Sequence, residues 1–239
     1  MITFSNKYRS HQAEIMDNLD FQGEEMKNLL SDLKYVNKWL GGNKVTLDGI
    51  EKLLLGNSKK ESITILDIGC GDGEMLRNCV KYAENNNLKL KCIGVDFNKN
   101  ILEYAENQSR DFPNIKFQKV DVFLDEELIP NCDIAICTLF LHHFNEERIS
   151  ELLYTLLKKS NNGLVINDLQ RSRMAFNLFK ILSKLFLKTK TAKYDGLVSI
   201  ARGFKKSELE HISKKIPNQK SEIHWRWAFR YQWIIKKKI

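Results

Sequence analysis

The segment that most constrains the fold is a glycine-rich loop, Asp67-Ile68-Gly69-Cys70-Gly71-Asp72-Gly73, which lies between an apolar run and a segment with helical spacing. The apolar run, residues 63–68, has the length of a buried strand, and the pattern at 74–84 predicts a helix. Glycines at alternate positions let the backbone turn sharply and approach a ligand, because they have no Cβ atom. The loop therefore predicts a strand, a ligand-binding turn and a helix in direct succession.

Four more short apolar runs follow this unit, and segments with helical spacing separate the runs from one another. The runs lie at residues 90–95, 115–120, 133–138 and 164–167, and the helical segments at 74–84, 100–110, 125–128 and 146–159. Because strand and helix alternate, we expect an α/β fold whose sheet is mostly parallel and carries helices on both faces. Ligands of such sheets lie outside the carboxyl ends of the strands, where the glycine loop is also expected.

Helical segments flank this core on both sides. Apolar residues spaced three to four apart from Met26 to Leu40 predict a helix, and residues 1–60 are expected to form an N-terminal helical cap. Residues 61–239 are expected to form the main domain, with a helical insertion at about 171–204 that contains one basic amphipathic helix. Aromatic and polar residues alternate from Trp225 to Trp233, which predicts a strand, or two strands that meet at a turn.

The charge of the chain is unevenly distributed. Residues 1–150 carry 18 Lys and Arg against 24 Asp and Glu, whereas residues 151–239 carry 20 against 6. A basic C-terminal third is able to bind nucleic acid, a membrane surface or an anionic substrate. Most of these charges are scattered lysines, which favours a solvated surface over a binding site for nucleic acid. The leucine and phenylalanine face of the inserted helix is expected to cover the sheet or the acceptor rather than to lie on a membrane.

Cysteine usage and the lack of long apolar runs indicate the compartment. No apolar run approaches the about 20 residues of a membrane span, and the first ten residues lack the apolar stretch of a signal peptide. The five cysteines include no Cys-x-x-Cys pair and no neighbouring histidine at zinc spacing. We therefore expect a cytoplasmic protein without a disulfide framework or structural zinc.

The glycine loop lacks the third glycine of a nicotinamide dinucleotide fingerprint. Such a fingerprint starting at Gly69 would need a glycine at position 74, which is Glu74.

Two further acidic residues end the strands that follow the loop. Asp96 ends the second apolar run, where a carboxylate can accept hydrogen bonds from both hydroxyls of a ribose, and Asp121 ends the third. Together with Asp67, these acids predict one crevice for a nucleoside ligand.

Over about residues 62–169 the sequence resembles the class I S-adenosylmethionine-dependent methyltransferases. The features that carry the resemblance are the glycine loop and the order of the two later acidic residues. The resemblance implies a Rossmann-like class I sheet, S-adenosylmethionine (SAM) as methyl donor and S-adenosylhomocysteine (SAH) as product. The resemblance implies that Asp67, Gly69 and Gly71 line the methionine part of the donor, with Gly73 in the same loop. It implies that Asp96 binds the ribose and that Phe97, Asp121 and the Val122 amide contact the adenine. Thr138 is implied to lie beneath the sulfonium.

The chemistry of methyl transfer limits the chemical classes of acceptor that are expected. The sulfonium is already activated, so no metal ion is expected. A phenol with a pKa of about 10 costs about 4 kcal/mol to ionise at pH 7, whereas an alkyl alcohol near water's about 15.7 costs about 12. Phenols and carboxylic acids are therefore favoured. His142 and His143, which follow the fourth run, are candidates for the base or for orienting the acceptor, and one of them is expected to be structural.

Two flanking segments, 9–17 and 167–173, look like those of bacterial small-molecule methyltransferases found beside type III polyketide synthases. This resemblance implies a polyketide-like phenol or a related acid as acceptor. It places His11, Glu14, Asp168 and Arg171 near the pocket. The alternatives are that the N-terminal segment, His11 above all, only packs, and that Asp168 and Arg171 form an ion pair.

The leading hypothesis is an S-adenosylmethionine-dependent O-methyltransferase acting on a small, partly apolar phenol or carboxylic acid. One alternative is an RNA methyltransferase that holds phosphates with the basic C-terminal third. The motif Asn-Pro-Pro-Tyr, typical of enzymes that methylate base amines, is absent, which weakens adenine methylation of DNA or RNA. Another alternative is a non-catalytic binding protein that has kept the donor fold, because a fold does not certify chemistry.

Overall fold

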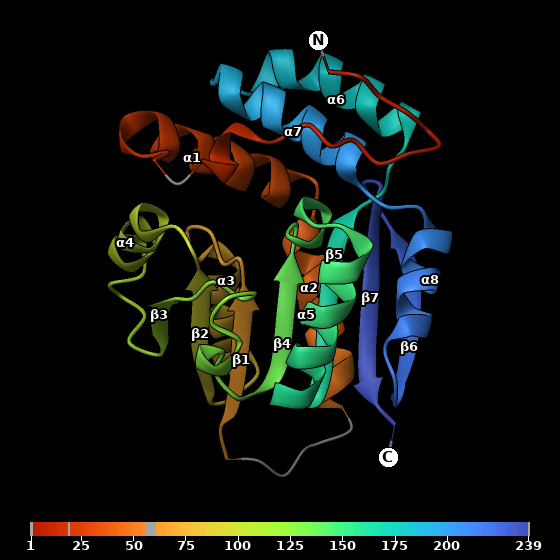
Figure 1. Ribbon diagram of the computed structural model, residues 1–239. Helices are drawn as coiled ribbons and strands as arrows, with labels where there is room; N and C mark the ends of the chain where they lie inside the picture. Colours follow the sequence, from red (N-terminus) through yellow and green to blue (C-terminus); the bar gives the residue numbers. More distant parts are fainter. Residues whose placement is uncertain (1, 19, 56–60, 239) are drawn as a thin grey trace.

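The computed structural model describes residues 2–18, 20–55 and 61–238, and it is built on one seven-stranded sheet (Figure 1). The strands lie in the order β3-β2-β1-β4-β5-β7-β6. Their bounds are β1 Ile63–Ile68, β2 Leu90–Asp96, β3 Ile115–Lys119, β4 Cys132–Thr138, β5 Ser160–Leu169, β6 Gln219–Arg226 and β7 Arg230–Lys237. Neighbours among β1 to β5 pair in parallel, whereas β7 is antiparallel to both β5 and β6. The predicted α/β fold with a mostly parallel sheet is confirmed.

Two apolar clusters cover the two faces of this sheet. On one face, α2 (Gly42–Leu54) and α3 (Glu74–Asn85) pack against the inner residues of the central strands. On the other, α5 (Glu146–Lys159) and α8 (Lys206–Lys215) pack through leucine and isoleucine side chains. The remaining helix of the sheet layer, α4 (Lys99–Gln108), is capped by Asn98, whose side chain accepts from two helix N–H groups. Both faces are therefore closed, and the carboxyl edge of the strands is left for a site.

A helical cap lies over that edge (Figure 1). It consists of α1 (Gly23–Trp39), α6 (Arg173–Phe186) and α7 (Lys190–Arg202), together with the segment that precedes α1. The carboxylate of Asp32 on α1 accepts hydrogen bonds from the backbone of the loop between α6 and α7. The cap thus joins the beginning of the chain to a region more than 150 residues later.

The structure changes two details of the predicted layout. The insertion holds two helices, α6 and α7, where the sequence pattern predicted one; Thr189 caps the second, accepting from the N–H of Ala192. Helix α2, which was assigned to the cap, packs on the sheet through Ile50 and Leu53. The predicted boundary at residue 60 lies outside the described residues, so the division into a cap and a main domain stays a prediction.

The C-terminal hairpin brings a turn to the same edge. Strands β6 and β7 meet at residues 227–229, where Phe229 has a φ of +57°. Of the alternating aromatic residues, Trp233 is fully buried, whereas Trp225 and Trp227 are 51% and 69% exposed. The aromatic strand is therefore only partly core, and its turn is free to take part in the site.

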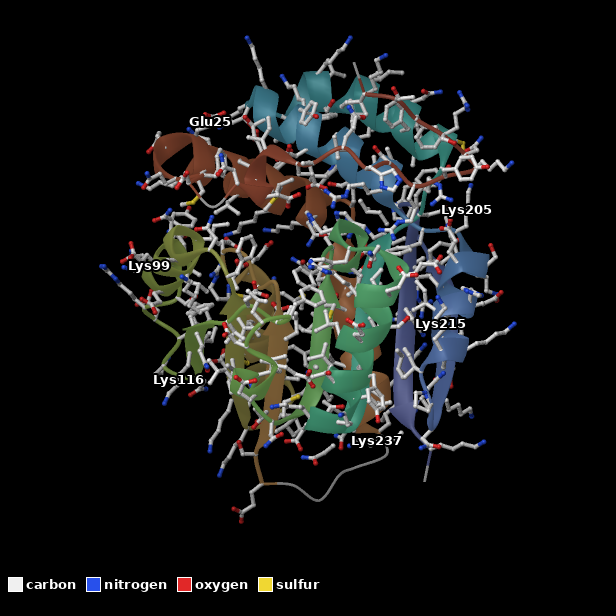
Figure 2. All side chains as sticks on the ribbon, viewed as in Figure 1. Glu25, Lys99, Lys116, Lys205, Lys215 and Lys237 are labelled. Atoms are coloured by element: carbon white, nitrogen blue, oxygen red, sulfur yellow. The ribbon has the colours of Figure 1, made fainter. Side chains whose placement is uncertain are left out.

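The lysines of the basic C-terminal third lie on the outside of several different elements. Of those labelled in Figure 2, Lys205 and Lys215 lie at the two ends of α8, and Lys237 is the last residue of β7. Of the helices within the described ranges, none combines the length and the apolar character that a membrane crossing requires.

Candidate active site

The glycine loop turns at the end of β1 with three residues in the left-handed region. Gly69, Gly71 and Gly73 have φ values of +67°, +53° and +75°. A Cβ atom at Gly69 would run into the ring of Phe140, and one at Gly73 would approach Phe117 to 2.6 Å. A Cβ atom at Gly71 would meet nothing within 4 Å. The loop therefore exposes its backbone to open space at Gly71, as expected of a loop that a ligand approaches closely.

The predicted acidic residues converge on this loop. One oxygen of Asp96 accepts from the N–H of Gly71 at 3.3 Å, and the other accepts from the N–H of Asn98 at 3.0 Å. Burial raises the pKa of Asp96. Burial and the nearby charge of Asp96 raise the pKa of Asp67 well above its ordinary value. Asp121 accepts from the N–H groups of Phe123 and Leu124 and so shapes its own turn. The three carboxylates lie at one edge of the sheet, as predicted.

Two cavities meet at Gly69, which lines both. The smaller, of about 240 Å³, is lined by Asp96, Phe97, Asp121 and Val122. The larger, of about 350 Å³, begins with Asp67, Gly71 and Thr138 and continues under the cap. Gly73 lines neither cavity, because the ring of Phe117 closes the space beside it. The predicted donor residues other than Gly73 are thus divided between two cavities that share Gly69.

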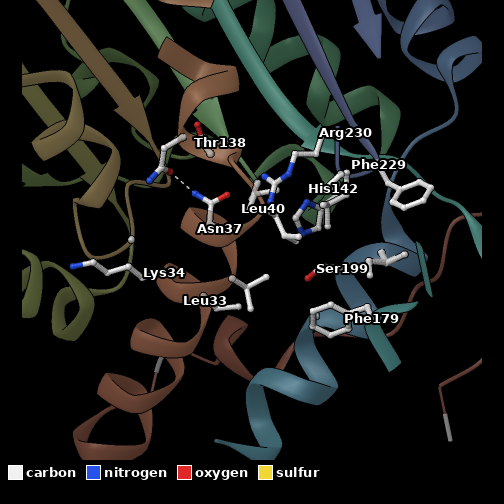
Figure 3. A pocket seen from close by; sticks show the side chains of 18 of the residues that line it. Leu33, Lys34, Asn37, Leu40, Thr138, His142, Phe179, Ser199, Phe229 and Arg230 are labelled. Carbon is white, nitrogen blue, oxygen red and sulfur yellow. Dashed lines mark hydrogen bonds between the residues drawn. The ribbon is translucent and has the colours of Figure 1, made fainter. Parts of the chain in front are cut away.

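The roof of the larger cavity is apolar, as Figure 3 shows from close by. Side chains of α1, of α6 and of the hairpin turn form it: Leu30, Leu33, Val36, Leu40, Leu178, Phe179, Leu182, Trp227 and Phe229. Other apolar residues of α6, among them Ile181 and Leu185, face outward and are exposed. The predicted amphipathic helix therefore covers the cavity with one part of its apolar face.

The floor of the larger cavity carries a polar cluster built from distant parts of the chain. His142 and His143 belong to a short 3-10 helix, η3 (Leu141–His143), directly after β4. The Nδ1 atom of His142 lies 2.7 Å from Asp168 Oδ1, and its Nε2 atom lies 3.3 Å from Glu14 Oε1. The Nδ1 atom of His143 lies 2.8 Å from Asp17 Oδ1. Each histidine is therefore held by its own carboxylate.

Burial and charge act in opposite directions in this cluster. Burial alone would lower the pKa of His142, but Asp168 and Glu14 outweigh it and raise that pKa to about 9. Burial opposes ionisation of Glu14, but the two histidines outweigh it and lower its pKa. The pKa of Asp17 falls to about 2, because His143 and Arg202 outweigh its burial. The carboxylates of the cluster are therefore ionised near neutral pH.

Two arginines fix the backbone of η3. Arg9 donates to the carbonyl oxygens of His142 and Phe144 at 2.7 and 2.8 Å. Arg202 donates to those of His142 and His143 at 3.2 and 2.6 Å, and its Nη1 atom lies 3.1 Å from Asp17. Neither role was predicted from sequence, although Arg9 lies in the segment that carries the subfamily resemblance. The backbone that carries the two imidazoles is thus fixed from two parts of the cap, the segment before α1 and α7.

A third arginine points into the larger cavity. Arg230, the first residue of β7, is 2% exposed, and its Nε and Nη1 atoms have no hydrogen-bond partner. Burial lowers its pKa to about 10, against the opposing charge of Asp168. Figure 3 shows its side chain reaching toward the same space as His142. In the alternating sequence from Trp225 to Trp233, Arg230 lies on the face opposite the aromatic residues.

Two of the predicted acceptor residues do not line the cavity. His11 is exposed on the segment before α1. Arg171 is buried elsewhere, where its guanidinium bonds both oxygens of Glu208 at 2.6 and 2.9 Å and the carbonyl of Gly203 at 2.7 Å. The ion pair considered between Asp168 and Arg171 is not formed, because Asp168 pairs with His142. Of the four predicted residues, Glu14 lines the cavity and Asp168 supports its floor.

Comparison with known proteins decides the family. The family model described as methyltransferase domain matches residues 59–232, which is most of the chain. The chain is a member of the methyltransferase domain family. The glycine loop, the smaller cavity and strands β1 to β6 lie within the matched range of this methyltransferase, whereas residues 14–43, which line part of the larger cavity, precede it.

A match to an individual curated protein covers a short part of the chain. The methyltransferase is 36% identical over 66 residues to malonyl-(acyl-carrier protein) O-methyltransferase of Halalkalibacterium halodurans, a match that covers 28% of this chain and 23% of that protein. The chain therefore spans less than a quarter of the length of this relative.

Solved structures show the same fold at low sequence identity. The plantazolicin methyltransferase BpumL in complex with SAH has a TM-score of 0.63 and 16% identity, covering 89% of this chain and 95% of that one. The magnesium protoporphyrin IX methyltransferase from Synechocystis PCC 6803 with bound SAH has a TM-score of 0.55 and 17% identity, covering 85% and 87%. Human N-acetylserotonin methyltransferase in complex with SAM has a TM-score of 0.62 and 13% identity, covering 90% and 57%.

Proposed function

We propose that this methyltransferase transfers the methyl group of SAM to an oxygen atom of a small, partly apolar phenol or carboxylic acid. The observation that carries the proposal is the buried Arg230, which lines a cavity with an apolar roof. A buried cation whose donors lack partners is costly, and an anionic ligand offsets that cost. An acceptor with an apolar body and one acidic oxygen matches both the roof and the arginine.

The donor would occupy the two cavities that meet at Gly69. In this proposal the carboxylate of Asp96 accepts from the ribose hydroxyls, and Phe97, Asp121 and Val122 surround the adenine. The methionine part follows the backbone of Gly71 past Asp67, so that the sulfonium faces Thr138. That side chain is held by a hydrogen bond of 3.0 Å to the hydroxyl of Thr46 on α2. Solved relatives that hold SAH or SAM support this donor.

The acceptor would fill the space between the roof and the histidine cluster. Alignment of nucleophile, methyl group and sulfur supplies much of the rate in such transfers, up to about 7 to 11 kcal/mol in favourable cases. The leucine and phenylalanine side chains of α1 and α6 would exclude water from the acceptor. Arg230 would fix its acidic group, and His142 or His143 would orient the attacking oxygen.

The test is methyl transfer with a matched panel of acceptors. Aromatic acids and phenols with apolar bodies are compared with the corresponding neutral alcohols, and SAH formation is measured. We expect turnover of acids or phenols, and Arg230→Gln should raise KM for acids by about 10- to 100-fold, in line with the loss of one or two charge-assisted hydrogen bonds. A protein that binds SAH but methylates only alcohols or amines would overturn the proposal.

A separate test addresses the donor site. In isothermal titration with SAH, Asp96→Ala should abolish measurable binding. Asp111→Ala, which removes an exposed carboxylate outside both cavities, serves as the matched control and should bind as the parent protein does.

No observation favours the RNA alternative, because the cavity roof is apolar and the lysines of the C-terminal third are divided among α6, α7, α8, β6 and β7.

A further inference from the structure

Three side chains of metal-ligating type converge on the floor of the larger cavity. One ligand atom from each of Glu14, His142 and His143 lies within 4.8 Å of the others. In residues 2–18, 20–55 and 61–238 no other group of three such side chains comes this close. We propose that these three residues bind one divalent transition-metal ion, which the sequence analysis did not expect.

The two imidazoles are oriented as metal ligands are. In metal sites a ligating histidine usually donates its second ring N–H to a carboxylate or carbonyl, which fixes the ring and the ligand atom. Here both histidines have this partner, Asp168 for His142 at 2.7 Å and Asp17 for His143 at 2.8 Å. Both Nε2 atoms are therefore left to face Glu14, at 3.3 and 3.9 Å from its two oxygens.

Two buried polar atoms of this cluster have no hydrogen-bond partner. Glu14 Oε1 and His142 Nε2 are 3.3 Å apart, yet they are not aligned as donor and acceptor. Buried polar atoms of this kind are rare in native proteins and call for an explanation. Two ligand atoms that are each about 2.1 Å from one ion lie about 3 to 3.5 Å apart, which matches this separation. A shared ion would satisfy both atoms at once.

Hydrogen bonds from other elements hold the segments that carry the three residues. Arg9 and Arg202 hold the backbone carbonyls of η3, and Asp195 accepts the N–H groups of Ile15 and Met16, next to Glu14. Two histidines and one carboxylate suit iron(II), manganese, cobalt, nickel or zinc rather than calcium, and they leave further coordination positions open. Because all three residues line the larger cavity, those positions face the space for the acceptor.

The inference deepens the proposed function, on which it rests only for the role of the ion. An ion at this place would bind the acidic oxygen of the acceptor directly and so fix the attacking atom. The binding of the ion itself requires neither SAM nor an acceptor, so the two ideas fail separately.

The test uses the untagged full chain, treated with a chelator, desalted and titrated with Co²⁺. We expect one Co²⁺ per chain, seen by visible absorption and by metal analysis after desalting. Glu14→Gln and His143→Ala should each weaken binding by at least 100-fold. Asp17→Asn, which removes a carboxylate partner without removing a ligand, should weaken it by about 10- to 100-fold.

The matched control is His211→Ala, which removes an exposed histidine 3.8 Å from Glu146 and should leave the Co²⁺ stoichiometry unchanged. Titration with SAH shows that each variant is folded. The proposal is overturned if the parent chain binds no Co²⁺, or if Glu14→Gln and His143→Ala bind it as the parent does. Methyl transfer by a chain without Co²⁺ affinity would leave the proposed function standing and remove the metal site.

Discussion

Substitution of Gly71 by alanine tests the glycine loop directly, because the added methyl group would enter the space assigned to the donor. Gly71 has a φ of +53°, and its added Cβ would meet no protein atom within 4 Å. Gly23, the first residue of α1, is the matched control: its φ is +74°, its Cβ would also meet nothing, and it is exposed and lines neither cavity.

Both variants are expected to lose folding stability, but only Gly71→Ala is expected to lose affinity for SAH. A non-glycine residue in the left-handed region costs about 1–2 kcal/mol, so both should lose about the same free energy of unfolding. Only Gly71→Ala adds a methyl group where a ligand packs, and overpacking costs about 1–3 kcal/mol. The dissociation constant for SAH should therefore rise by about 5- to 150-fold in Gly71→Ala and stay unchanged in Gly23→Ala.

Urea unfolding measures the shared cost, and isothermal titration with SAH measures the difference. If Gly71→Ala is destabilised as expected but binds SAH like the parent protein, the donor does not pass along this loop and the reasoning fails. If Gly23→Ala loses SAH affinity as well, the effect belongs to the left-handed strain and not to the methyl group.

Three further predictions concern the surroundings of the site. Glu208→Gln leaves Arg171 buried without its counterion, which should cost about 3 kcal/mol and lower Tm by about 6 to 12 °C in calorimetry, with SAH binding retained. Burial raises the pKa of Asp195 from 3.8 to about 6, so the folded protein holds a proton there that the unfolded chain releases. The free energy of unfolding should thus decline from about pH 4 to pH 6 because of this group, and the difference between the parent and Asp195→Asn in urea titrations should show it; a difference independent of pH would contradict it. Leu33→Trp should fill the roof and abolish turnover of the acceptor while SAH affinity is kept; unchanged turnover would place the acceptor elsewhere.

Local sequence patterns predicted the parts of the fold and site that depend on neighbouring residues. The loop from Asp67 to Gly73 combines an apolar strand, alternate glycines and a helix, and it therefore identified both the family and the edge of the sheet where the cavities lie. Asp96 and Asp121 could be placed because carboxyl ends of parallel strands meet at one edge.

The remaining features depend on contacts between distant residues. Glu14 and His142 are 128 positions apart, and nothing in either segment shows that their side chains meet. Helix α7 was missed because its apolar face is interrupted by Lys193, Tyr194 and Gly196, and tertiary packing supplies the stability that the pattern lacks. Arg171 was placed at the pocket on resemblance alone, and Glu208, which holds it elsewhere, lies 37 residues later.

The anchoring of the N-terminal segment sets an order of events during synthesis. Arg9, Ser10 and Asp17 find their partners at Ala201 and Arg202, so they leave the ribosome about 190 residues before those partners exist. Contacts that close such long loops form late, because the entropy of closure must be met first. Residues 69–148, which line the smaller cavity, are synthesised well before that. The larger cavity, whose lining includes residues up to Arg230, is completed only when nearly the whole chain is available.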